Sequence, residues 1–118
     1  MSDSNKNEEI LAHHLGAVSA GNIAAILEDY DENAVVISPY RVLRGVEQIK
    51  QMNEVMLKSL PPGSSLQVTQ KLVTEKMAYI VWNAESTNVK VPFGTDTFFI
   101  ENGKIVAQTF ALQMIPKT

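Results

Sequence analysis

Two kinds of side chain in this sequence could move protons, an isolated aspartate and a pair of adjacent histidines. Asp96 is the one acidic residue between Glu85 and Glu101, and it stands at the head of the strand-like apolar run TDTFFI. A carboxyl group in an apolar pocket loses solvation, which raises its pKa and lets it donate a hydrogen bond or carry a proton. The alternative is an aspartate bound to a backbone amide or a neighbouring side chain, and the sequence leaves both interpretations open.

The histidines belong to a first helix, which the apolar spacing predicts over residues 8–20. His14 falls between Ile10 and Val18 on the inner side of this helix, whereas His13 falls on the outer side. An inner histidine could donate a hydrogen bond or transfer a proton near neutral pH. The alternative is a half-buried core residue.

Several further residues are candidates for lining an apolar pocket. Tyr30 ends a short second helix predicted over residues 23–30, and Trp82 shares its strand phase with Ile80. Both side chains combine an apolar body with one polar tip, which suits a pocket wall and also ordinary core packing. The remaining candidates for ligand contacts are Ser38, Phe98, Gln108 and Phe110.

Other motifs argue against metal or cofactor chemistry. The acidic cluster at residues 28–32 is interpreted as a solvated helix end, because its spacing is not that of a calcium loop. Adjacent histidines diverge by about 100° on a helix and do not chelate a metal. There is no Gly-rich phosphate loop, no G-x-S-x-G or H-E-x-x-H motif and no cysteine. We therefore expect neither a cofactor nor a metal. Arg41 and Arg44 either lie at the mouth of the pocket, where they could bind anions, or are ordinary surface residues.

Length and charge restrict the partners. The chain has 118 residues, a net charge of -3 and a pI near 5.3, which argues against a nucleic-acid partner. No apolar run approaches the roughly 20 residues needed to span a bilayer, and the polar start MSDSNKNEE is unlike a signal peptide. The expected location is cytoplasmic.

Turn signals divide the chain into a disordered lead at residues 1–6 and a single domain over residues 7–118. The domain is expected to contain three helices, at residues 8–20, 23–30 and 46–60. It is expected to contain five strands, at residues 34–39, 65–73, 77–86, 95–101 and 104–115. Helices followed by a run of antiparallel strands indicate an α+β fold, with the helices on one face of the sheet.

Three segments resemble those of the nuclear transport factor 2-like superfamily, which includes ketosteroid isomerase and the SnoaL-like polyketide cyclases. They are AVSAGNIAAILEDYDENAVVISP, RGVEQIKQM and GTDTFFIENGKIVAQTF, in that order. The resemblance covers nearly the whole chain. It implies a cone-shaped, cystatin-like α+β fold, in which a curved, mainly antiparallel sheet wraps around the three helices and encloses an apolar pocket.

The resemblance also implies roles for single residues. Asp96 matches the aspartate that ketosteroid isomerase keeps protonated to stabilise an oxyanion, a known case and not a result of this sequence. His14 matches the position of an oxyanion tyrosine, and Ser38 matches the catalytic-base aspartate. A serine without a partner is a poor general base at neutral pH, which argues against steroid isomerisation. Ser38 could still bind a ligand, or it could simply end a strand before Pro39.

The turn ENG between the last two expected strands decides which side chains face the pocket. A two-residue Asn-Gly turn places Asp96 opposite Thr109, whereas a three-residue loop over residues 101–103 places it opposite Gln108. One residue of slip moves every side chain to the other face. We favour the three-residue loop because it puts Asp96 and Gln108 on a mostly apolar wall. The same wall then carries Phe98, Phe110 and Leu112.

The outer sheet face is predicted to be uncovered and not cleanly polar. It would carry Thr97, Phe99, Ile105, Ala107, Thr109 and Ala111. A chain of this length has no second layer left for that face, so we expect a homodimer through it.

The sequence thus predicts a protein that binds a small apolar ligand. One hypothesis is a cofactor-free isomerase or cyclase that moves protons next to a carbonyl, with Asp96 stabilising charge on oxygen and His14 assisting. A second hypothesis is a non-catalytic binding module with the same pocket. A third is a dimeric interaction domain whose pocket is merely core.

Overall fold

The computed structural model describes residues 3–117, which form three helices and one six-stranded sheet. The helices are α1 (Asp3–Ala20), α2 (Ile23–Glu28) and α3 (Gly45–Ser59). The strands are β1 (Tyr30–Ile37), β2 (Val42–Arg44), β3 (Ser65–Val73), β4 (Met77–Glu85), β5 (Val89–Glu101) and β6 (Lys104–Pro116). No helix among these residues is both long and apolar enough to cross a membrane.

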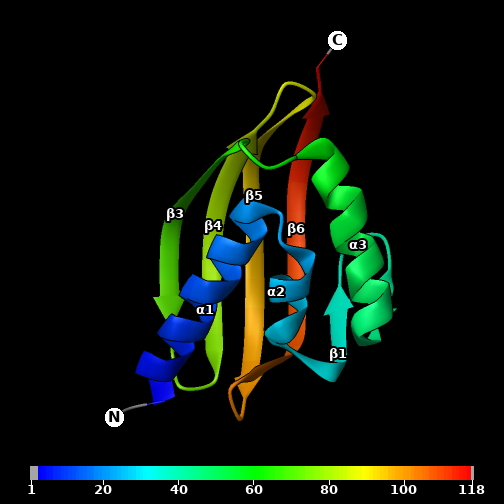
Figure 1. Ribbon diagram of the computed structural model, residues 1–118. Helices are drawn as coiled ribbons and strands as arrows, with labels where there is room; N and C mark the ends of the chain where they lie inside the picture. Colours follow the sequence, from blue (N-terminus) through cyan, green and yellow to red (C-terminus); the bar gives the residue numbers. More distant parts are fainter. Residues whose placement is uncertain (1–2, 118) are drawn as a thin grey trace.

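All three helices lie on one side of a curved sheet (Figure 1). The strand order is β2-β1-β6-β5-β4-β3, with β1 and β6 parallel and every other pair of neighbours antiparallel. The predicted α+β class, with helices on one face of a mainly antiparallel sheet, is confirmed. The core fills the space between the helices and the concave face. Its largest fully buried side chains are Phe98, Ile26, Ile49, Ile105, Val36 and Val91.

The N-terminal boundary differs from the prediction. Residues 3–6 belong to α1, where the sequence had predicted a disordered lead, and residues 1 and 2 lie outside the described part. Asn7 gives a physical reason, because its buried side chain donates a hydrogen bond to the carbonyl oxygen of Thr74 at 3.1 Å. This bond ties the first turns of the helix to the turn between β3 and β4.

The second helix is shorter than predicted. Asn22 caps its start by accepting a hydrogen bond from the backbone N–H of Ala25 at 3.1 Å, as the sequence suggested. The helix ends at Glu28, so Tyr30 begins β1 and does not end a helix. Strand β2 was not predicted, since its three residues are too few to show an alternating pattern.

The β5–β6 hairpin closes with a two-residue turn, so the predicted three-residue loop is wrong. Asn102 and Gly103 have φ angles of 52° and 77°, the left-handed conformation that a type I′ turn requires at both central residues. Glu101 pairs directly with Lys104 across this turn.

A β-bulge next to the turn restores the predicted faces. The register shifts by one residue on β6, so that Phe99 pairs with Ala107 and Asp96 pairs with Phe110. The predicted pairing of Asp96 with Gln108 is therefore wrong. Since Phe110 lies two residues beyond Gln108, however, all three side chains still share the concave face.

The two-residue turn also changes the predicted outer face. Ile105 is 1% exposed and pairs with Ile100 and with Tyr30, so it belongs to the core. The outer face instead carries two cross-strand rows without a charged side chain. These rows are Leu72, Tyr79, Thr97 and Thr109, and Met77, Phe99 and Ala107. No helix within residues 3–117 covers them (Figure 1).

Gly94 allows the indole of Trp82 to lie against β5. The two residues are cross-strand partners, and a Cβ atom on Gly94 would lie 2.5 Å from Trp82 Cε2. A methyl group at this position therefore has no room unless the indole moves.

Gly94→Ala should destabilise the protein by about 1–3 kcal/mol through overpacking, measured as the free energy of unfolding in urea. Gly16→Ala in α1 is the matched control. Nothing lies within 4 Å of its added Cβ, and alanine favours a helix over glycine by about 0.5–1 kcal/mol. Equal stability of the two variants would contradict the close contact between Gly94 and Trp82.

Candidate functional site

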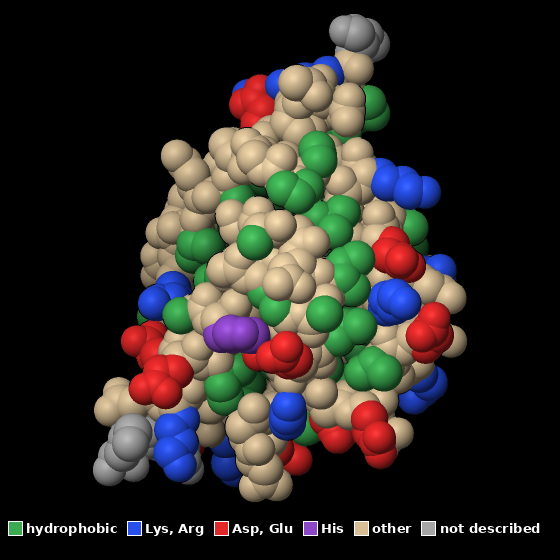
Figure 2. Space-filling model, in the orientation of Figure 1, with side chains coloured by type: hydrophobic (Ala, Val, Ile, Leu, Met, Phe, Trp, Pro, Cys, Tyr) green, Lys and Arg blue, Asp and Glu red, His purple; other side chains and the backbone are tan. Residues whose placement is uncertain are grey.

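A cavity of about 130 Å³ lies between the helices and the concave face of the sheet. The three helices form one wall, and inward-facing residues of β1 and of β3 to β6 form the other. The lining is mainly apolar, and Figure 2 shows hydrophobic side chains gathered over α3 and between α3 and the α1–α2 pair. Polar residues among the lining include His14, Tyr30, Asn53, Asp96 and Gln108.

A line of hydrogen bonds crosses the sheet side of the cavity. The indole Nε1 of Trp82 donates to Asp96 Oδ1 at 2.7 Å, and Gln108 Nε2 donates to Asp96 Oδ2 at 2.7 Å. The hydroxyl of Tyr30 donates in turn to Gln108 Oε1. The four residues come from β4, β5, β6 and β1, so the line depends on the register of all four strands.

Burial brings the pKa of Asp96 close to neutral pH. Desolvation raises the pKa of its carboxyl to about 7, against the lowering effect of the hydrogen bonds from Trp82 and Gln108. Tyr30 is also buried, and desolvation together with the charges of Asp96 and Asp29 raises its pKa well above the ordinary value. Tyr30 therefore stays protonated and remains a hydrogen-bond donor.

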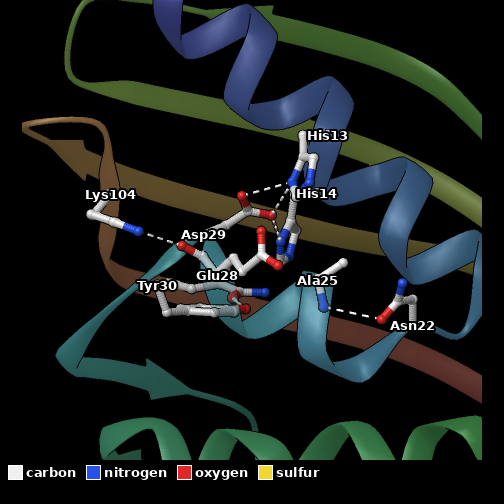
Figure 3. A network of polar contacts seen from close by, with 9 residues as sticks. His13, His14, Asn22, Ala25, Glu28, Asp29, Tyr30 and Lys104 are labelled. Carbon is white, nitrogen blue, oxygen red and sulfur yellow. Dashed lines mark hydrogen bonds and ion pairs between the residues drawn. The ribbon is translucent and has the colours of Figure 1, made fainter.

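A second carboxyl group, Asp29, contacts both histidines (Figure 3). His14 Nδ1 lies 3.0 Å from Asp29 Oδ2, and His13 Nδ1 lies 2.8 Å from Asp29 Oδ1. His14 is buried, whereas the side chain of His13 is 48% exposed. Asp29 thus joins a histidine that lines the cavity to one at the surface.

The end of α2 holds Asp29 in place. Asp29 is the C-cap residue of α2, and its carbonyl oxygen accepts a hydrogen bond from the backbone N–H of Ile105 at 2.7 Å. Lys104 Nζ donates to the carbonyl oxygen of Glu28 at 2.5 Å, which satisfies one free carbonyl at the helix end (Figure 3). The β5–β6 hairpin therefore fixes both the end of α2 and the acid that follows it.

The charge on Asp29 determines the proton positions on His14. Burial raises the pKa of Asp29, but the hydrogen bonds from His14 and His13 and their charges outweigh it, so the pKa lies below its ordinary value. An ionised carboxylate only accepts hydrogen bonds, so His14 Nδ1 must carry a proton. In neutral His14 the other nitrogen, Nε2, then has a free lone pair and can act as a base.

The two rings next to His14 also line the cavity. The centroid of the His14 ring lies 5.3 Å from that of Tyr30 and 5.4 Å from that of Phe98, both in edge-on arrangement. Such contacts restrict the rotation of the imidazole. Together with the bond to Asp29, they fix its orientation.

The structure brings most of the predicted site residues to this cavity. Asp96 and His14 line it, as do the predicted ligand contacts Tyr30, Trp82, Phe98, Gln108 and Phe110. Ser38 does not. Its hydroxyl donates to the carbonyl oxygen of Arg41 and accepts from the backbone N–H groups of Tyr40 and Arg41, each at 3.2 Å.

The position of Ser38 has a simple physical cause. β1 ends at Ile37, and Pro39 cannot continue the strand, so Ser38 begins the turn to β2. Arg41 lies in this turn and Arg44 ends β2; both are exposed and do not line the cavity. The prediction that Ser38 points into the cavity is wrong.

Asp29 is the site residue that sequence reasoning missed. It belongs to the cluster EDYDE, which looked like a solvated helix end, yet it is 8% exposed. A helix end at Glu28, combined with an inward-facing histidine on the preceding helix, was the signal that could have identified it. No group of three or more His, Asp or Glu side chains in the described chain is placed to hold a metal ion.

Comparisons with known proteins agree on one fold. A family model described as SnoaL-like domain matches residues 11–108. Among solved structures, the chain is similar to SalBIII, an epoxide hydrolase/cyclase-like enzyme with a role in pyran ring formation in the polyether salinomycin. The TM-score is 0.82 at 21% identity, over 99% of this chain and 100% of SalBIII.

Two further structures resemble the chain at lower identity. A candidate ketosteroid isomerase from Kribbella flavida gives a TM-score of 0.80 at 14% identity, over 96% of this chain and 82% of that one. An NTF2-like protein of unknown function from Burkholderia xenovorans gives 0.79 at 18% identity, over 92% and 84%. No curated protein matches the chain by sequence. At these identities the structural likeness concerns the fold.

Asp96→Asn tests whether the carboxyl of Asp96 is protonated in the folded protein. Its pKa is raised from 3.8 to about 7, so the folded protein keeps a proton that the unfolded chain releases between these values. The free energy of unfolding should therefore fall as the pH rises from about 4 to about 7. Asparagine keeps the shape and removes the ionisation, so the variant should be as stable as wild type, or more stable, at about pH 8. At about pH 4 the substitution should leave the free energy of unfolding nearly unchanged.

Denaturant midpoints of both proteins at the two pH values measure this effect. A loss of about 1–3 kcal/mol for the variant at the higher pH would show that the hydrogen bonds to the carboxylate outweigh its burial. That result would contradict the raised pKa of Asp96.

Proposed function

Because this chain belongs to the SnoaL-like domain family, we propose that it is a cofactor-free isomerase or cyclase that acts on a small apolar carbonyl compound. The resemblance to the nuclear transport factor 2-like superfamily that the sequence indicated is thereby confirmed. One observation carries the proposal. A base, His14 held by Asp29, and an acid, Asp96, line the same apolar cavity.

The chemistry of these groups suits proton transfer next to a carbonyl. His14 Nε2 would take a proton from the carbon beside the carbonyl, so that a C–H bond breaks, an N–H bond forms and negative charge moves to the carbonyl oxygen. Asp29 would stabilise the imidazolium through its bond to Nδ1. Hydrogen bonds from the Asp96 side of the cavity would stabilise the oxygen, and return of the proton to another carbon would complete an isomerisation.

The pair of His14 and Asp29 also supplies the general base that Ser38 cannot provide. The resemblance places a catalytic base at Ser38, but this side chain caps a turn outside the cavity. In this proposal the base comes from α1, and the ligand is held by the apolar wall. Tyr30, Trp82, Phe98 and Phe110 are the proposed wall contacts. The names of SalBIII and of the Kribbella flavida protein support a cyclase or isomerase reaction, although neither names a substrate for this chain.

Deuterium exchange into acetophenone tests the proposal without knowledge of the natural substrate. The wild-type protein should accelerate exchange of the methyl hydrogens in D₂O, followed by NMR, because these hydrogens lie next to a carbonyl. His14→Gln should reduce the acceleration by about 100-fold or more, the usual contribution of a general base, while ketone binding persists. His13→Gln is the matched control, since His13 contacts Asp29 from the surface and should affect exchange far less.

Two results would contradict the catalytic proposal. Binding of acetophenone without accelerated exchange would favour a non-catalytic binding module with the same pocket. Equal exchange rates for His14→Gln and His13→Gln would remove His14 from the role of base.

We also propose a homodimer formed through the outer face of the sheet. The two rows at Leu72–Thr109 and Met77–Ala107 lack charged side chains, and Leu72, Met77 and Phe99 are 58%, 41% and 37% exposed. An apolar face of this kind on a monomer is typical of an interface. A second copy of the chain is the proposed cover.

Phe99→Lys should convert the dimer to a monomer in sedimentation experiments, because it places a charge in each half of the proposed contact. Val55→Lys on α3 is the matched control, because Val55 is a 65% exposed hydrophobic residue on the helix side of the molecule. Loss of the dimer with Val55→Lys, or a wild-type protein that is monomeric at micromolar concentration, would place the interface elsewhere or exclude it.

A further inference from the structure

The hydrogen bonds from Trp82 to Tyr30 form a line, and the groups at its two ends both keep their protons. The indole N–H of Trp82 can only donate, and Tyr30 stays protonated because burial and nearby charges raise its pKa. Asp96 and Gln108 stand between them, and both can change the direction in which they donate. The state of this middle pair therefore decides where the proton of Tyr30 points.

With Asp96 ionised, the line is closed as the structure has it. The carboxylate accepts from Trp82 on Oδ1 and from Gln108 Nε2 on Oδ2, each at 2.7 Å. The amide oxygen of Gln108 then accepts the hydroxyl proton of Tyr30. Tyr30 has one proton, and in this state none is left for a ligand.

With Asp96 protonated, the same arrangement fails. Trp82 already donates to Oδ1, so the added proton belongs on Oδ2, where it meets the N–H of Gln108. Two donors facing each other are repulsive, and reversal of the Gln108 amide removes the conflict. Asp96 then donates to Oε1, and Nε2 donates to the oxygen of Tyr30, whose proton must turn away from Gln108.

We propose that Gln108 is a specificity-determining residue whose amide reverses when Asp96 gains a proton, which turns Tyr30 into a hydrogen-bond donor for a ligand oxygen in the cavity. The proposal deepens the proposed function and rests on it, because it names the ligand group as an acceptor oxygen such as a ketone carbonyl. A protonated Asp96 thus selects acceptor ligands, although Tyr30 is the group that contacts them.

Few other groups can disturb this coupling. Among the described residues that line the cavity, the side chains of an ionisable type are His14 from α1, Tyr30 from β1 and Asp96 itself. The lining residues of α3 and β3 include Met52, Asn53 and Val68, and none of the lining residues from these two elements ionises. Asp29 and His13 are joined to the far side of the His14 ring through its Nδ1. Asp96, with a pKa raised to about 7 by burial, populates both states near neutral pH.

A ligand-free NMR titration tests the reversal directly. Trp82 is the single tryptophan of the chain, so its indole N–H gives one signal that reports on Asp96. We expect the Trp82 indole and the Gln108 side-chain amide signals to shift together with one midpoint near pH 7. Both should lose this titration in Asp96→Asn. A Gln108 amide that stays still while the Trp82 signal titrates would overturn the proposal.

Binding of acetophenone, which accepts hydrogen bonds and donates none, tests the consequence. The wild-type protein should bind it about tenfold more tightly at pH 6 than at pH 8.5, the effect of about one hydrogen bond. Tyr30→Phe should bind weakly at both values. Asp96→Asn should bind tightly at both, because the asparagine N–H donates to Gln108 as the protonated acid does.

Other outcomes separate the two proposals. Full pH dependence in Tyr30→Phe would mean that Asp96 donates directly to the ligand, and it would overturn the role of Gln108. Failure of acetophenone to bind at any pH would count against the proposed carbonyl ligand, whereas the ligand-free titration would still decide whether the amide reverses. Gln108→Leu adds a check, since it should abolish the pH dependence of binding while the Trp82 signal still titrates.

Discussion

The concave face carries Asp96 and Gln108 together because β6 holds one extra residue next to its turn. A two-residue Asn-Gly turn without this bulge would pair Asp96 with Thr109, and Gln108 would then face outward. The hydrogen bond between Asp96 and Gln108, and the one from Gln108 to Tyr30, would both be impossible. The two-residue turn pairs Ile105 with Ile100 and so places it in the core, where its backbone N–H donates to the carbonyl oxygen of Asp29. The turn and the bulge together therefore position both acids of the site.

The two acids differ in charge because their partners differ. Asp96 accepts from an indole and an amide, which are neutral donors, and burial dominates to raise its pKa. Asp29 faces two histidines, whose hydrogen bonds and charges outweigh its burial and lower its pKa. Near neutral pH one site can thus hold a carboxylic acid and a carboxylate. In the proposed switch, a protonated Asp96 donates to Gln108, whose amide then donates to Tyr30. The ionised Asp29 accepts from His14 Nδ1, which leaves Nε2 of the neutral ring as an acceptor.

The sequence predicted the architecture well because helical spacing and strand alternation record burial directly. It placed Asp96, His14 and Gln108 on inner faces for the same reason. It missed the bulge, since neither Val106 nor Ala107 marks an irregular backbone as a glycine would. The predictions of the loop length and of the pairing of Asp96 were both wrong, but their errors cancelled, so that Asp96 and Gln108 still share one face. The predictions for Ser38 and Asp29 were wrong for a different reason. Whether a polar residue at the end of a helix or strand turns inward depends on tertiary contacts, which no local sequence pattern contains. In Asp29 these contacts come from Ile105 and from His14.

An apolar cavity whose polar groups are already satisfied gains ligand affinity mainly from burial of apolar surface. Within residues 3–117 every buried side-chain nitrogen or oxygen has a hydrogen-bond partner, so the cavity does not require a polar guest. A ligand oxygen can be recognised only by a group that gives up an internal partner or has one bond to spare. The lone pair of His14 Nε2 in the neutral ring only accepts and cannot bind a carbonyl oxygen, whereas the Tyr30 hydroxyl proton becomes available when Gln108 Oε1 no longer accepts it. In the proposed switch, selectivity for a carbonyl over a plain hydrocarbon comes from rearrangement within the protein, because reversal of the Gln108 amide keeps the number of internal hydrogen bonds unchanged.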